Sequence, residues 1–150
     1  MMKLINYFLS FLFAACLLSL LTACEVNNKV AVIDSWARAN APGQTVGAAY
    51  MTFVSAQDST FVKAETTIAN SVEIHSMKMD NGVMKMRMLN ELPLGAGKPE
   101  KLAPGGFHLM LFDLKKQLIA GENINLTLTF RDNAGKLTQQ QLTLPIKEAE

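Results

Sequence analysis

Residues 71–89 read SVEIHSMKMDNGVMKMRML, two runs of strand-forming side chains on either side of Asn81-Gly82. An Asn-Gly pair between such runs is the strongest short-range signal for a two-residue hairpin turn. Residues directly opposite each other in a hairpin project from the same face of the sheet. Counting outward from the turn therefore predicts three opposed pairs on one face, namely His75 with Met88, Met77 with Met86, and Met79 with Met84.

Strand patterns continue on both sides of this hairpin, and no stretch carries a convincing helical period. Residues 123–130 alternate apolar and polar side chains, as a half-buried strand does. Glycine, proline and asparagine mark turns between the runs. The pattern predicts a single all-β domain, with strands at 30–33, 36–39, 46–55, 61–64, 71–79, 84–89, 107–114, 123–130 and 136–144.

The start of the chain has the composition of an export signal. Lys3 supplies a basic start, an apolar run covers residues 4–21, and Leu21-Thr22-Ala23-Cys24 ends it. That tetrapeptide resembles the lipobox of bacterial lipoproteins, in which the cysteine is acylated and becomes the new N-terminus. An ordinary cleaved signal and an uncleaved N-terminal helix stay open as alternatives, because the apolar run approaches the length that spans a bilayer.

The lipobox interpretation sets the expected organisation of the chain. Residues 1–23 would be a removed signal peptide with its lipobox at 21–24, and residues 24–29 a short tether lipidated at Cys24. The protein would then lie in the cell envelope, anchored to a membrane and facing the periplasm. Glu25 after the cysteine, in place of aspartate, favours the outer membrane.

Composition limits what the mature chain does. Cys24 to Glu150 is 127 residues, room for one domain with one core. Of the 14 basic residues only Lys3 lies in the signal, so the remaining 13 balance the 13 acidic residues, and a nucleic acid partner is not expected. With Cys24 acylated, no thiol remains for a disulfide or a nucleophile. A soft metal site would have to be built without thiolate.

Methionine and histidine gather around the hairpin. Five of the seven methionines after the signal lie between positions 77 and 88. The two histidines of the chain, His75 and His108, are each followed two positions later by a methionine, Met77 or Met110. Positions i and i+2 of a strand share a face, so His108 and Met110 can both point at one ion while Leu109 enters the core.

Imidazole nitrogen and thioether sulfur form a soft, neutral ligand set. That set suits Cu(I) better than Mg²⁺, Ca²⁺ or Mn²⁺, which prefer oxygen, and better than zinc, which takes cysteine, histidine and carboxylate. Two other interpretations stay open: the methionines are core packing, or they form a metal-free, adaptable docking surface. A catalytic role with His75 or His108 as general base lacks a partner at a recognisable spacing, so we expect no enzyme.

The spacing of these residues resembles the periplasmic copper chaperones of the PCu(A)C family: His75, ten residues, Met86, twenty-one residues, His108, one residue, Met110. Residues 72–79 and 104–110 also look like that family, and the resemblance runs from Val30 to Phe130. It implies a cupredoxin-like Greek-key β-sandwich or barrel over residues 30–147. It also implies a Cu(I) ion bound by His75, Met86, His108 and Met110, with neighbouring methionines at Met77, Met79, Met84 and Met88.

The resemblance further implies a metallochaperone that supplies copper to respiratory cytochrome c oxidase assembly, at its CuA site. We expect a monomer that passes Cu(I) by ligand exchange to an oxidase subunit or another copper chaperone. Sequestration of copper for tolerance would use the same site and stays open as an alternative.

Overall fold

A computed structural model describes residues 29–148 as an all-β domain. The predicted signal peptide, the lipobox with Cys24 and most of the tether lie outside these residues. Within them, no helix is long and apolar enough to cross a membrane. The strands are β1 (Ala31–Arg38), β2 (Gly47–Val54), β3 (Ser59–Glu65), β4 (Ser71–Asp80), β5 (Val83–Leu89), β6 (Leu92–Leu94), β7 (Glu100–Leu102), β8 (Phe107–Phe112), β9 (Asn123–Asp132) and β10 (Leu137–Lys147).

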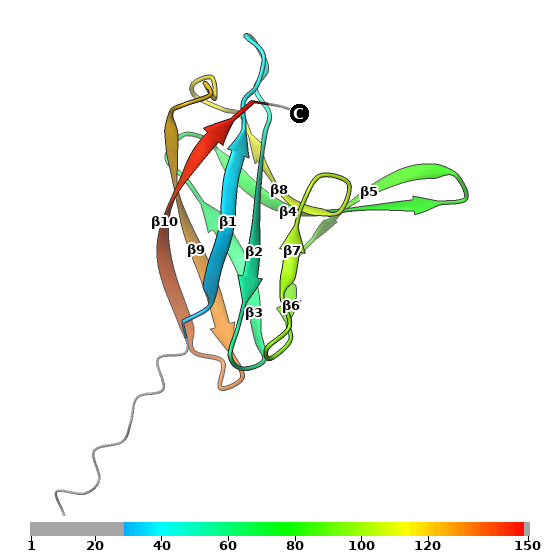
Figure 1. Cartoon of the computed structure of the whole chain (residues 1–150), viewed down its shortest axis with the longest axis vertical. Coiled ribbons are helices and arrows are strands. Elements are labelled where there is room, and N and C mark those ends of the chain that lie inside the picture. The colour runs from blue at the N-terminus through cyan, green and yellow to red at the C-terminus, as the bar shows by residue number, and fades with distance from the viewer. Residues whose placement is uncertain (1–28, 149–150) are drawn as a thin grey trace, which may run out of the picture.

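The strands form one sheet that folds into two layers. Their order is β5-β4-β8-β7-β2-β1-β10-β9-β3-β6, and β2 also pairs with β8. The first layer runs from β5 to β1 and the second from β10 to β6, with a parallel pairing of β1 and β10 where the layers join. The predicted all-β sandwich is confirmed (Figure 1).

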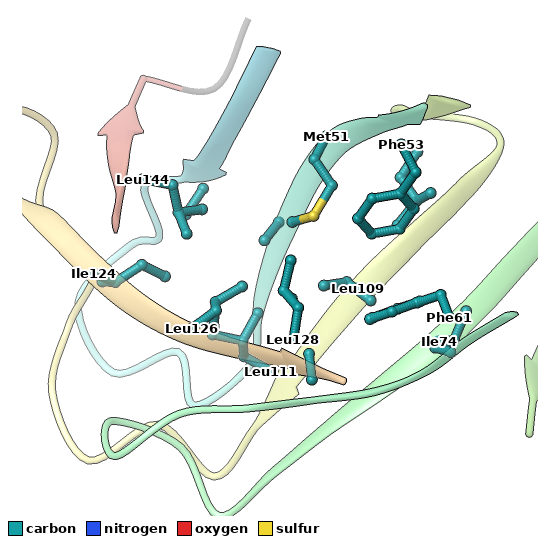
Figure 2. Packing of buried hydrophobic residues seen from close by; sticks show 14 of the residues in the cluster. Met51, Phe53, Phe61, Ile74, Leu109, Leu111, Ile124, Leu126, Leu128 and Leu144 are labelled. Carbon is teal, nitrogen blue, oxygen red and sulfur yellow. The ribbon is translucent and has the colours of Figure 1, made fainter. Parts of the chain in front are cut away.

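The hydrophobic core fills the space between the layers. The apolar half of the predicted alternation in β9 is confirmed, because Ile124, Leu126, Leu128 and Phe130 are all buried. The polar half is corrected at Thr129, which is buried as well instead of facing solvent. Figure 2 shows apolar side chains gathered between β9 and the strands β2 and β8, Met51 and Leu109 among them. The buried residues of this cluster run from Val30 to Ile146, so the span contains a core of its own and we expect it to fold by itself.

The structure corrects the strand prediction at β1, at the end of β8 and at two short strands. The runs at 30–33 and 36–39 are one strand, β1, interrupted by a bulge where Asp34 takes a φ of 53°. Strand β8 stops at Phe112, two residues before the predicted end, because Asp113 takes a left-handed φ of 52°. The three-residue strands β6 and β7 were not predicted, since so short a run carries no readable period.

The β4–β5 hairpin has the predicted turn and register. Asn81 and Gly82 have φ values of 52° and 79°, the two positive angles that a type I′ turn requires. All three predicted pairs are present, His75 with Met88, Met77 with Met86, and Met79 with Met84. In the described part of the chain β5 pairs with β4 alone, and the hairpin projects from the sandwich (Figure 1).

Candidate metal centre

Two histidines from distant parts of the chain lie side by side on the outer face of the first layer. His75 on β4 stands directly opposite His108 on β8, and their ring centroids are 5.9 Å apart. A metal–imidazole bond is about 2 Å long, so a single ion fits between rings at this separation. The antiparallel pairing of β4 with β8 therefore creates a two-nitrogen site that neither strand has alone.

Each histidine uses one ring nitrogen in a hydrogen bond and leaves the other free. His75 Nε2–H donates to Glu73 Oε2 at 2.8 Å, and its buried Nδ1 has no hydrogen-bond partner among residues 29–148. His108 Nδ1–H donates to the carbonyl oxygen of Gly106 at 3.1 Å, which leaves Nε2 with the lone pair. Metal-binding histidines show this arrangement, in which a carboxylate or carbonyl orients the ring. The histidine donors therefore fit a metal ion.

Thioethers surround the histidine pair. A cavity of about 280 Å³ is lined by Met77 and Met86 from the hairpin and by His108 and Met110 from β8. Three of the four predicted ligands line this cavity. The fourth, His75, does not line it, but its ring lies next to the ring of His108, which does. Met77, predicted only to lie near the ligands, lines the cavity as directly as Met86 does.

The histidine and methionine side chains of the site differ sharply in burial. His108 is only 5% exposed, whereas Met86 is 46% exposed. The imidazoles therefore lie at the base of the site and a thioether forms its rim. An ion held here would be approached by another molecule from the thioether side.

The other methionines fall into two groups. Met79, Met84 and Met88 are exposed on the hairpin and do not line the cavity. Met51 is fully buried in the core, on the inner side of β2 (Figure 2). The methionine cluster of the sequence is thus a surface feature of the hairpin, not core packing.

Sequence reasoning missed the side chains that flank the cavity on its β1 and β2 side. Arg38 Cζ lies 5.4 Å from the centroid of the Tyr50 ring, and both residues line the cavity. Burial raises the pKa of Tyr50, and the nearby Arg38 opposes that rise. Glu73 was also missed, although its position two residues before His75 on a strand places it on the same face.

Comparisons with known proteins identify the family and the fold of this chain. A family described as "Putative lipoprotein LpqE-like" matches residues 30–145. "Putative lipoprotein Lxx21020" of Leifsonia xyli subsp. xyli is 30% identical over 120 residues, 79% of this chain and 70% of that protein. The solution structure of CuI-DR1885 from Deinococcus radiodurans is 26% identical, with a TM-score of 0.62 and 83% of each chain covered. The copper-bound PCuAC domain from PmoF2 is 22% identical, with a TM-score of 0.65, over 81% of this chain and 94% of that one.

The two-layered fold is that of a PCuAC domain, as the likeness to the PmoF2 domain shows. The chain belongs to the LpqE-like lipoprotein family, because that family matches it over nearly the whole described span. The predicted membership of the PCu(A)C family is thereby confirmed, together with the cupredoxin-like sandwich that the resemblance implied.

Proposed function

We propose that this protein is an extracytoplasmic copper chaperone that binds one Cu(I) ion through His75, Met86, His108 and Met110. The observation that carries the proposal is the opposed histidine pair, each ring with one free nitrogen, beside a cavity lined by methionines. The protein acts by binding and release, without catalysis. Its cargo is the copper ion itself.

The donor chemistry favours this ion. Two neutral imidazoles and two thioethers leave the site with the single positive charge of Cu(I), and thioether sulfur selects soft ions. A thioether needs no deprotonation and forms no disulfide, so the site keeps working in an oxidising compartment. The copper named for the Deinococcus protein, at 26% identity, supports the same cargo here.

The position of the donors suggests how the ion leaves. Met86 lies on the exposed rim, so an incoming ligand can replace it first, while the buried His108 holds the ion. Replacement of thioethers one at a time transfers Cu(I) with no change in its oxidation state. We propose delivery in this way to the CuA site during cytochrome c oxidase assembly, from a monomeric chaperone to an oxidase subunit or a second copper chaperone.

We base the proposed location on the sequence. The proposed lipidation of Cys24 anchors the domain to a membrane, facing the periplasm, and Glu25 favours the outer membrane. The word lipoprotein in the name of the family and of its Leifsonia relative supports this proposal. A short tether would keep the copper site near that membrane.

A transfer experiment tests the proposal. Residues 25–150, loaded with one equivalent of Cu(I), are mixed under anaerobic conditions with an apo CuA domain and separated from it again. Delivery predicts that copper leaves with the acceptor, and that the matched core variant Met51→Leu transfers as the wild type does. Copper retained by a loaded chaperone would favour sequestration for tolerance. A folded protein that takes up no copper would favour the metal-free docking module.

A further inference from the structure

Exposed thioethers extend beyond the cavity to the tip of the hairpin. Met79 is 65% exposed and Met84 is 50% exposed, although methionine is an apolar side chain that usually lies in a core. These two residues oppose each other across β4 and β5, one pair beyond Met77 and Met86. Their exposure shows that they do not stabilise the fold by burial.

The hairpin separates its thioethers from its cations. Opposed pairs share a face, so the methionines lie on one face with His75, while Lys78, Lys85 and Arg87 lie on the other. Lys85 Nζ is paired with Asp80 Oδ2 at 2.6 Å on that reverse face. The methionine face is therefore free of ammonium groups in the part of the hairpin near its tip.

Three of these methionines lie close enough to share an ion. Met79 and Met84 are an opposed pair, and opposed Cβ atoms in a hairpin are about 5 Å apart. Met77 and Met84 are diagonal neighbours, at about 7–8 Å. Met77 and Met79 are two residues apart on β4, about 7 Å. Methionine has three rotatable bonds, so the three sulfur atoms can converge on one soft ion.

We propose that Met77, Met79 and Met84 form a second Cu(I) site on the hairpin, made of thioethers alone. The site binds more weakly than the histidine site, because it lacks imidazole and lies over a cationic reverse face. Met77 borders both sites, since it also lines the cavity. Copper captured at the tip can therefore move through Met77 to the tighter site, a loading role that rests on the proposed function.

Nuclear magnetic resonance tests this site residue by residue. Residues 25–150, with carbon-13 in the methionine methyl groups, give one signal for each of seven methionines and are titrated anaerobically with Cu(I). A parallel titration uses Ag(I), which is not oxidised in air. The first equivalent is expected to move the signals of Met86 and Met110. The second is expected to move those of Met79 and Met84, and Met51 in the core is expected not to respond.

Variants separate this inference from the proposed function. Met79→Leu combined with Met84→Leu is expected to remove the second step and keep the first, whereas Met88→Leu, opposite His75, keeps both. A titration that ends after one equivalent, or a second step that survives the double variant, would overturn the second site. Movement of the tip signals without those of Met86 and Met110 would instead overturn the proposed function. Copper loading at wild-type rate in the double variant would overturn the loading role.

Discussion

Glu73 Oε2 accepts a hydrogen bond from His75 Nε2–H at 2.8 Å, while the His75 ring stands opposite His108 on the neighbouring strand. The carboxylate fixes the ring orientation and leaves the buried Nδ1 available to bind a metal ion. Glu73 is not itself a proposed ligand, yet it determines which nitrogen of His75 can bind a metal ion.

Removal of this carboxylate is therefore expected to weaken copper binding. Glu73→Leu should lower Cu(I) affinity about 10- to 100-fold, the usual effect of losing a partner that orients a metal-binding histidine. Competition with a chromophoric chelator measures the change. Glu65→Leu, on the exposed surface of β3, is the matched control and should bind as the wild type does. Equal affinities for the two variants would mean that Glu73 does not orient a ligand.

Copper affinity is expected to depend on pH. Protons compete with a metal for imidazole nitrogen but not for thioether sulfur. Affinity should therefore fall as the solution is acidified from about pH 7 to about pH 5. Chelator competition at several pH values gives the curve. An affinity that stays constant across this range would exclude both histidines as ligands.

The pKa of Tyr50 can be used to test the contact between Arg38 and Tyr50 in the cavity wall. It is the single tyrosine after the predicted signal, so the ultraviolet absorbance of phenolate follows it alone in residues 25–150. Burial raises its pKa above the usual 10.0 and Arg38 counteracts this. Arg38→Met should therefore raise the pKa further. A lower pKa in the variant would contradict the contact between the guanidinium and the ring.

The same shift has a consequence for stability at high pH. Because the folded-state pKa of Tyr50 is raised, folding loses stability as pH rises above the unfolded value of 10.0 through the folded value. Tyr50→Phe, which cannot ionise, should lose less stability over that interval in chemical unfolding. Identical pH profiles for the two proteins would show that Tyr50 does not contribute.

A substitution in the turn at the hairpin tip is expected to lower copper affinity more than it lowers the stability of the fold. Gly82 has a φ of 79°, and a β-branched side chain there costs about 1–2 kcal/mol. Gly82→Val should disturb the Met77–Met86 register and weaken copper binding, with little change in global unfolding, because the exposed hairpin lies outside the core. Gly135→Val, at a φ of 82° in the turn between β9 and β10, should destabilise the fold and leave copper affinity unchanged.

Local patterns predict the hairpin well, and long-range pairing explains what the sequence leaves open. The turn at Asn81-Gly82 and the period of two were enough to predict every opposed pair of β4 and β5 on the methionine face. The contact between His75 and His108 depends on the register of β4 with β8, which no local pattern contains. For that contact the sequence offered only a family resemblance.

The same reason explains the residues that were missed. Arg38 and Tyr50 reach the cavity because β2 pairs with both β1 and β8, which places Ala48 opposite Met110. Nothing near positions 38 and 50 indicates that neighbourhood. Glu73 could have been found, since it shares a strand face with His75, but a carboxylate beside a histidine is common on exposed sheets.

The most direct test of the copper site is a Cu(I) titration of residues 25–150 against a chelator strong enough to empty sites made of thioether alone. The wild type and Met51→Leu should each retain one equivalent. A Met86→Leu, His108→Phe double variant that unfolds at a similar temperature should retain none. Retention by the double variant, or loss by the wild type, would contradict the assignment of Met86 and His108 as copper ligands.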